Sequence, residues 1–221
     1  MMNRKKRVLV TGGSRGIGAA IVNRLMDEYH IVAPTRDDLD LRCSDSISRY
    51  FEINNEFDAI VNNAGVNIIK PLSEILIEDI RHINAINLEA PLLIAKYCVP
   101  YMRSRKWGRI VNISSIWGVK SKAYRTLYSG TKFGLIGYTK SLANELACDN
   151  ILVNAVCPGF TNTELTANSL SLEQLNSILA SVPMHRMASP EEIANVVLFL
   201  LSEANSFMTG QAIVVDGGFL S

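Results

Sequence analysis

The feature that most constrains the fold is a glycine-rich loop near the amino terminus, Thr11-Gly12-Gly13-Ser14-Arg15-Gly16-Ile17-Gly18. It follows a short apolar run at residues 7–11 and opens a segment of helical periodicity at residues 16–29. Glycine is needed where the chain turns sharply and where backbone approaches a phosphate, and a helix start offers free N–H groups to that phosphate. The loop therefore predicts a dinucleotide-binding strand-loop-helix unit; a glycine-rich turn without a ligand is the alternative.

The rest of the chain alternates short apolar runs with longer segments of helical period. Runs that are Val- and Ile-rich on both faces are typical of parallel strands covered by helices. The strand candidates are residues 7–11, 31–34, 59–62, 109–114, 152–157 and 212–215, and the helix candidates are residues 16–29, 46–54, 80–104, 126–148 and 190–203. This order predicts an α/β fold with a doubly wound, mostly parallel sheet of the Rossmann type and helices on both faces. Because no linker or repeat interrupts it, we expect residues 1–221 to form a single domain.

Composition and charge exclude several classes of protein. Apolar residues make up 48% and charged residues 19%, so most of the chain is not disordered. Lys plus Arg (22) and Asp plus Glu (21) nearly cancel, which argues against a nucleic-acid partner. The apolar runs are too short for a secretory signal or a membrane span. We therefore expect a cytoplasmic protein without a membrane partner.

The cysteines and histidines do not indicate a metal site. The four cysteines contain no CxxC pair, so we expect reduced thiols. His30, His82 and His185 show no ligand spacing. We therefore expect the protein to work without a metal ion.

Tyr128 and Lys132 lie four positions apart within the helix candidate 126–148. On a helix this spacing places both side chains on one face, about 6 Å apart along the axis. A nearby ammonium favours the phenolate and lowers the pKa of a tyrosine, which suits it to general acid-base catalysis. Taken alone, the pair is more typical of an exposed amphipathic helix, and the other motifs of the chain favour catalysis.

Further motifs follow the glycine loop in a fixed order. They are Asn62-Asn63-Ala64-Gly65, Asn87, Ser115, Tyr128-Ser129-Gly130-Thr131-Lys132, Pro158-Gly159 and Asp216-Gly217-Gly218. Together with the GxxxGxG spacing of the loop, this set resembles the short-chain dehydrogenase/reductase family, and within it the single-domain branch that resembles 3-oxoacyl-carrier-protein reductases. The resemblance extends from residue 11 to residue 218, and it implies one dinucleotide-binding oxidoreductase domain.

The resemblance also implies the catalytic roles. Tyr128 would act as general acid/base, and Lys132 would steady its phenolate and hold the nicotinamide ribose. Ser115 would hydrogen-bond the substrate oxygen beside Tyr128, with Ser114 as the adjacent alternative. Asn87 would hold a water molecule through its backbone and connect Lys132 to solvent; the alternative is an asparagine packed under the sheet.

The same resemblance implies a set of residues around the nicotinamide cofactor. It comprises Gly12, Ser14, Arg15, Gly16, Ile17, Gly18, Arg36, Asp40, Leu41, Asn63, Ala64, Gly65, Tyr128, Lys132, Pro158, Gly159, Thr161 and Thr163. Within this set, Asp40 and Leu41 would contact the adenine.

The end of the second strand bears on the choice of cofactor. Family members that use NAD carry an acid there, and the matching position in this chain is Thr35, followed by Arg36. Arg36 and Arg15 converging on one phosphate would favour NADP(H), with NAD(H) as the other cofactor considered. In the alternative interpretation Arg36 pairs with Asp37 or Asp38.

The chain departs from the family just after this point. Only three residues separate Arg36 from Asp40. We therefore expect the helix that the family carries between its second and third strands to be shortened or missing.

The substrate side is less defined in the sequence. Residues 160–188 are where the family varies its lid, and here they carry a helical apolar stripe that is more often packing than pocket. Lys120, Lys122 and Arg125 precede Tyr128, which suggests an anionic substrate or carrier, although solvated surface charge is the blander interpretation.

The sequence thus predicts an NADP(H)-dependent oxidoreductase that transfers hydride between nicotinamide and a small-molecule carbonyl or secondary alcohol. The alternatives are an NAD-dependent alcohol or sugar dehydrogenase and, among non-enzymes, a dinucleotide-sensing protein. The resemblance further implies a homo-oligomer, either a dimer or a tetramer.

Overall fold

A six-stranded parallel sheet forms the centre of the computed structural model, which describes residues 4–163 and 172–221. The strands are β1 (Arg7–Val10), β2 (His30–Val32), β3 (Ala59–Asn62), β4 (Gly108–Ile113), β5 (Ile151–Pro158) and β6 (Ala212–Val215). They stand in the order β2-β1-β3-β4-β5-β6. The strand order reverses between β1 and β3, and ligands of open α/β sheets bind at such a reversal, beyond the carboxyl ends of the strands.

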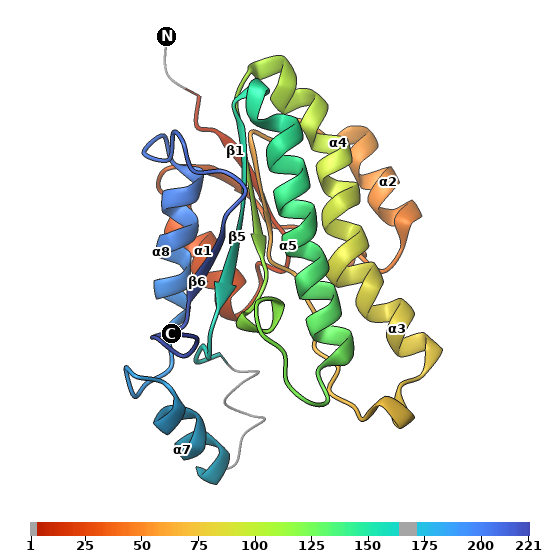
Figure 1. Cartoon of the computed structure of the whole chain (residues 1–221). Helices are drawn as coiled ribbons and strands as arrows, with labels where there is room; N and C mark the ends of the chain where they lie inside the picture. The colour runs from red at the N-terminus through yellow and green to blue at the C-terminus, as the bar shows by residue number, and fades with distance from the viewer. Residues whose placement is uncertain (1–3, 164–171) are drawn as a thin grey trace.

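Helices cover both faces of the sheet, as the alternation of strands and helices predicts (Figure 1). α1 (Gly16–Leu25) and α8 (Pro190–Leu201) pack together on one face. α2 (Ser44–Ile53), α4 (Ala90–Arg105) and α5 (Thr126–Leu146) cover the other. The predicted doubly wound α/β fold is confirmed.

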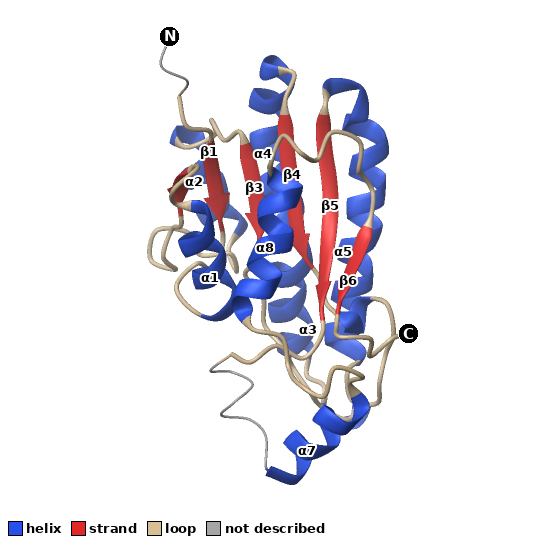
Figure 2. Cartoon of the chain, turned by 90° about the vertical axis from the view of Figure 1, so that its left-hand side faces the viewer, coloured by secondary structure: helices blue, strands red, loops and turns tan. Residues whose placement is uncertain are grey.

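The central strands are buried on both faces, which explains their nearly continuous apolar sequences. Leu9, Ile60 and Ile110 pair in register across β1, β3 and β4, and they pack against α2 and α4. Their neighbours in sequence, such as Val61 and Val111, face α1 and α8. Figure 2 shows the sheet from the α8 side, with the carboxyl ends of the strands at its lower edge.

The predicted helix 80–104 belongs to a longer helical run with a defect inside it. The run comprises α3 (Ile77–Asn84), a π-helical turn at Ala85–Glu89, and α4. Pro91 supplies the physical reason, because it has no N–H for the carbonyl of Asn87 four residues earlier, and its ring would clash with that carbonyl in a regular α-helix. A π turn holds one more residue per turn than an α-helix, which moves the carbonyl of Asn87 away from the ring of Pro91.

A turn takes the place of the helix that the family carries after its second strand. No helix lies in the described segment between Val32 and Ser44, as predicted. The carboxylate of Asp38 closes the turn by accepting hydrogen bonds from the backbone N–H of Thr35 (3.0 Å) and from its hydroxyl (2.7 Å).

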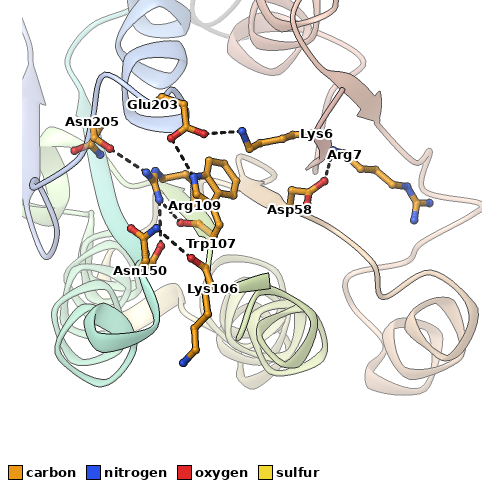
Figure 3. Close-up of polar contacts among 10 residues, drawn as sticks. Lys6, Arg7, Asp58, Lys106, Trp107, Arg109, Asn150, Glu203 and Asn205 are labelled. Atoms are coloured by element: carbon orange, nitrogen blue, oxygen red, sulfur yellow. Dashed lines mark hydrogen bonds and ion pairs between the residues drawn. The ribbon is translucent and has the colours of Figure 1, made fainter. Parts of the chain in front are cut away.

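At the amino end of the sheet, far from the glycine loop, a fully buried arginine connects three segments (Figure 3). Arg109 donates from Nη1 to the carbonyls of Gly108 (2.8 Å) and Asn150 (3.2 Å), and from Nη2 to that of Asn205 (3.0 Å). Its guanidinium lies over the ring of Trp107, 4.5 Å from the centroid. These contacts hold the loops that lead into β4 and β5.

One helix lies apart from the two layers. α7 (Leu172–Ser181) sits beyond the carboxyl ends of the strands, within residues 160–188 where the sequence places a lid (Figure 1). Residues 164–171 of that segment, including Leu165 and Leu170 of the apolar stripe, lie outside the described residues.

Candidate active site

Two adjoining clefts open at the carboxyl ends of the strands, on either side of the glycine loop. One, of about 700 Å³, lies over the loop and the turn after β2; the other, of about 950 Å³, lies between α5 and α7. Every residue that the sequence assigns to the cofactor lines one of them, and Arg15, Asn63 and Thr163 are among those that line both. Asn87 lines neither.

The glycine loop is shaped by contacts that side chains would prevent. Gly12 and Gly16 adopt positive φ angles of 65° and 54°, which residues with a Cβ rarely adopt. A Cβ on Gly18 would lie 2.0 Å from the carbonyl oxygen of Gly12. The loop therefore presents bare backbone to the cleft and the start of α1 beyond it, an arrangement that suits a pyrophosphate.

Asn63 braces this loop from the neighbouring strand. Its side-chain amide donates to the carbonyls of Thr11 and Gly12, both at 3.0 Å. In return, the hydroxyl of Thr11 accepts hydrogen bonds from the backbone N–H groups of Asn63 and Ala64, both at 3.1 Å. The turns after β1 and β3 thus form one rigid wall at the point where the strand order reverses.

The far end of the first cleft is rich in charge. Arg42 donates from Nε to both carboxylate oxygens of Asp40, at 2.9 and 3.0 Å, and this hydrogen bonding lowers the pKa of Asp40 to about 2. Among the described residues, Arg36 forms no ion pair with Asp37 or Asp38, because Asp38 is engaged with Thr35. Arg42 lines the first cleft and is not among the residues predicted from the sequence. The turn after β2 places it there.

In the second cleft, Tyr128 and Ser115 come together from α5 and from the end of β4. Burial raises the pKa of Tyr128, and a hydrogen bond with Ser115 and the charge of Arg125 oppose that rise. The neighbouring Ser114 is committed elsewhere, since its buried hydroxyl donates to the carbonyl of Lys132 at 3.0 Å. The geometry therefore favours Ser115 over Ser114 as the hydroxyl beside Tyr128.

Lys132 lies one helical turn beyond Tyr128, with Nζ 5.6 Å from the centroid of its ring. The ammonium is buried and donates to the carbonyl of Ile113 at 2.7 Å. Burial lowers the pKa of Lys132 to about 8. The sequence reasoning gave Lys132 the task of lowering the pKa of Tyr128, whereas in this structure Ser115 and Arg125 are the groups that lower it.

Asn87 sits in the π turn, behind the wall of the cleft. Its carboxamide accepts from the N–H of Val66 and donates to the carbonyl of Val66, both at 2.8 Å, and also donates to Thr131 at 3.2 Å. A Cβ on Gly65 would lie 3.4 Å from Asn87 Oδ1 and 3.5 Å from Lys132 Nζ, so these two side chains converge on one glycine. The side chain of Asn87 is thus packed and connects neighbouring segments. The backbone carbonyl of Asn87 has no α-helical hydrogen-bond donor, because Pro91 has no N–H.

Two aromatic residues, Trp117 and Phe160, line the second cleft. Phe219 packs against both, and the three rings meet edge to face with centroids 5.2 to 6.3 Å apart. These residues come from distant segments that no sequence spacing connects. Arg125 lies over the ring of Trp117, 5.5 Å from the centroid.

Within the described ranges, no group of three or more His, Cys, Asp or Glu side chains is placed to hold a metal ion. A search of the same ranges for a helix with the length and apolarity to span a bilayer finds none.

Comparison with known proteins assigns the family. A family model for short-chain dehydrogenases, described as Enoyl-(Acyl carrier protein) reductase, matches residues 38–220, which is most of the chain. The chain belongs to the short-chain dehydrogenase/reductase family. The resemblance that the sequence motifs indicate is thereby confirmed, and with it the assignment of the chain as an oxidoreductase.

Relatives within the short-chain dehydrogenase/reductase family match nearly end to end. The 3-oxoacyl-[acyl-carrier-protein] reductase FabG of Aquifex aeolicus is 40% identical over 215 residues, covering 96% of this chain and 86% of the relative. The structure of ElxO with NADP bound is 30% identical, with a TM-score of 0.88 over 98% of this chain and 99% of that one. The structure of 4-hydroxyisoleucine dehydrogenase complexed with NADH is 27% identical, with a TM-score of 0.92 over 97% and 98%. Short-chain dehydrogenase/reductases that bind NADP and NADH therefore share this fold, and use of a nicotinamide dinucleotide follows from the family.

Proposed function

We propose that this protein is an NADP(H)-dependent carbonyl reductase, with Tyr128 as the general acid/base. The observation that carries the proposal is the meeting of Tyr128 and Ser115 in the second cleft, with Lys132 one turn away along α5. Burial raises the pKa of Tyr128, so its hydroxyl carries a proton at neutral pH, the state that a proton donor to a carbonyl oxygen requires. Run in reverse, the same groups oxidise a secondary alcohol.

The bare backbone of the glycine loop and the start of α1 fit the pyrophosphate of a dinucleotide, and the bound nicotinamide would supply or accept the hydride. In this proposal Ser115 holds the substrate oxygen beside the Tyr128 hydroxyl. Tyr128 donates its proton to that oxygen as charge develops on it, and Lys132, whose pKa of about 8 leaves it mostly charged at neutral pH, stabilises the phenolate that remains. Asn87 keeps the wall beside Lys132 in place through Val66.

The preference for NADP(H) rests on the cations of the first cleft. Thr35 stands where an acid would receive the ribose hydroxyls of NAD, and its hydroxyl is engaged with Asp38. Arg15 and Arg36 line this cleft and form no ion pair within the described residues, so both are available to an additional phosphate. The NADP-bound neighbour ElxO supports this preference, and the NADH-bound 4-hydroxyisoleucine dehydrogenase represents the alternative, an NAD-dependent dehydrogenase.

The remaining functional assignments are proposals that follow from the same site. The substrate is a small-molecule carbonyl compound or alcohol, and a 3-oxoacyl thioester, the substrate class in the name of the Aquifex relative, is the first compound to test. We place the enzyme in the cytoplasm as a homo-oligomer, dimer or tetramer. Exposed Leu92 of α4 and Phe133 of α5 support the assembly, which light scattering of the purified protein would measure.

The decisive experiment compares Tyr128→Phe with wild type in NADPH oxidation across a panel of ketones and 3-oxoacyl thioesters. We expect the variant to bind NADPH as wild type does and to lose about a hundred- to ten-thousandfold in kcat. Tyr124→Phe, which changes an exposed tyrosine of the preceding loop, is the matched control and should retain activity. Full activity of Tyr128→Phe would refute the acid/base role, and failure of wild type to oxidise NADPH with any carbonyl would favour a dinucleotide-sensing protein.

A further inference from the structure

Arg125 is a cation in the second cleft that has no counter-ion among the described residues. Its side chain is half-buried and lies over the ring of Trp117, 5.5 Å from the centroid. Among the residues that the structure describes, it forms no ion pair and no side-chain hydrogen bond. Burial lowers its pKa, which means that the charge is held in a place that disfavours it. A guanidinium left in this state is stabilised when an anion arrives.

The described charges around Arg125 do not supply that anion. In the part of the chain that the structure describes, the cleft is lined by four basic side chains, Arg15, Lys122, Arg125 and Lys132, and by one acidic side chain, Glu173 of α7. Glu173 is exposed and forms no ion pair with any of them within the described residues. Arg15 and Lys132 have roles toward the cofactor in the proposed function, so the positive charge that remains on the substrate side is that of Lys122 and Arg125.

The backbone holds Arg125 in a fixed position. Tyr124 adopts a positive φ of 68°, and its carbonyl accepts a hydrogen bond from the N–H of Lys70 at 3.2 Å. The carbonyl of Arg125 accepts from the N–H of Ser129 at 2.7 Å, as the first turn of α5 begins. Because the guanidinium also rests on Trp117, little conformational freedom remains to be lost when a ligand binds.

The position of Arg125 relative to Tyr128 restricts which anion it can bind. The two residues are three positions apart at the start of α5, a spacing that places side chains about 5–6 Å apart at their Cβ atoms. Their charges also act on each other, since Arg125 opposes the rise in the pKa of Tyr128. Because Arg125 and Tyr128 line the same cleft, an anionic group on Arg125 would belong to the same small substrate as the carbonyl that Tyr128 protonates.

We infer that Arg125 binds a carboxylate of the substrate, so that the enzyme selects 2-oxo or 3-oxo acids, or the matching hydroxy acids, over neutral carbonyl compounds. This inference rests on the proposed function. The planar guanidinium matches a carboxylate with two parallel hydrogen bonds. The carboxylate takes no part in bond making: the carbonyl carbon gains the hydride, the carbonyl oxygen gains the proton of Tyr128, and NADPH becomes NADP⁺.

The test uses a 3-oxo acid and its methyl ester, which differ in the negative charge and little else near the reacting carbonyl. We expect wild type to have a lower KM for the acid than for the ester. Arg125→Gln should raise the KM for the acid about ten- to a hundredfold and the KM for the ester little. Any change in kcat, which follows the pKa of Tyr128, should be the same for the acid and the ester. Arg125→Lys should restore part of the loss. Arg105→Gln, which changes an exposed arginine at the far end of α4, is the matched control and should behave as wild type.

The outcomes separate this inference from others. Equal losses for acid and ester would overturn it and show that Arg125 acts only through Tyr128. A selective loss for a phosphorylated ketone, with none for the acid, would overturn it in favour of a phosphate. If wild type reduces neutral ketones and thioesters but shows no preference for acids, the inference fails and the proposed function stands. If no carbonyl is reduced, the proposed function fails, and thermal-shift binding of the acid against the ester to wild type and Arg125→Gln still decides the role of Arg125.

Discussion

The carboxamide of Asn87 forms hydrogen bonds with both the N–H and the carbonyl of Val66, each at 2.8 Å. With its third bond, to Thr131, it connects the π turn, the loop after β3 and helix α5. Val66 lines both clefts, and α5 carries Lys132. A single side chain therefore connects the wall that the two clefts share to the helix of Lys132.

Replacing Asn87 with alanine should destabilise the protein and weaken catalysis together. The change leaves the part-buried N–H and carbonyl of Val66 without partners, and we expect a loss of about 2 kcal/mol in the free energy of unfolding and a lower kcat. Asn144→Ala, on the exposed side of α5, is the control. Denaturant unfolding monitored by circular dichroism measures the first effect. A variant as stable as wild type would show that the three hydrogen bonds contribute nothing.

The buried ammonium of Lys132 should make stability depend on pH in the alkaline range. Its pKa is lowered from 10.5 to about 8 in the folded protein. Below pH 8 both folded and unfolded states carry the proton, and the folded state bears the cost of burying it. Between pH 8 and 10.5 the folded state releases the proton while the unfolded state keeps it, so stability rises with pH.

The measurement compares ligand-free wild type with Lys132→Met over that range, so that other titrating groups cancel. Wild type should gain about 3 kcal/mol relative to the variant on going from pH 8 to pH 10.5. A difference that stays constant with pH would mean that Lys132 titrates at its ordinary pKa.

Arg36→Ala should change the discrimination between the two cofactors. Arg36 lines the first cleft and has no ion pair among the described residues, so we expect the variant to lose about tenfold in affinity for NADPH and little for NADH. Arg49→Ala, an exposed change on α2, controls for loss of surface charge. Isothermal titration with each cofactor gives the result, and equal losses for both cofactors would contradict a role at the additional phosphate.

Gly18→Ala should be damaging because a methyl group has no room there. The added Cβ would meet the carbonyl of Gly12 at 2.0 Å, and relieving the clash must displace the glycine loop. We expect a loss of about 1–3 kcal/mol in stability and weak cofactor binding. Gly137→Ala is the contrasting control, because its Cβ would meet nothing within 4 Å and alanine favours a helix by about 0.5–1 kcal/mol. Destabilisation by Gly137→Ala would instead indicate that a second copy packs on α5.

Arg109→Met should lower stability without affecting the chemistry. The change removes the donors to three buried carbonyls at the amino end of the sheet, and we expect a loss of about 2–4 kcal/mol. The clefts lie at the opposite end of the strands, so kcat at 25 °C should be unchanged. A fall in kcat with stability intact would show coupling along the sheet that we do not expect.

The sheet and the clefts could be predicted because local signals agree with the fold. Val- and Ile-rich runs set the strands, and the glycine loop, the NNAG motif and Pro158 all follow strand ends, which parallel pairing brings to one edge of the sheet. Placing Tyr128 and Lys132 on one face of a helix required only the periodicity of the α-helix. These features depend on neighbours in sequence, or on strand order that the family resemblance supplies.

The rest depends on contacts between distant residues. No spacing in the sequence indicates that Phe160 and Phe219 would join Trp117. The sequence did not indicate that Ser115 and Arg125 act on the pKa of Tyr128, because burial and the approach of Arg125 are tertiary effects. The π turn was not predicted although Pro91 is visible in the sequence. The periodicity of apolar residues is the same whether or not one backbone carbonyl in the helix is displaced.

The short turn after β2 affects more than the first cleft. In the described part of the chain no strand lies beyond β2, so this strand of three residues, His30–Val32, forms the border of the sheet. An edge strand of three residues offers a strand of another molecule too few backbone groups for pairing. The short chain at this point thus protects the sheet from edge-to-edge aggregation.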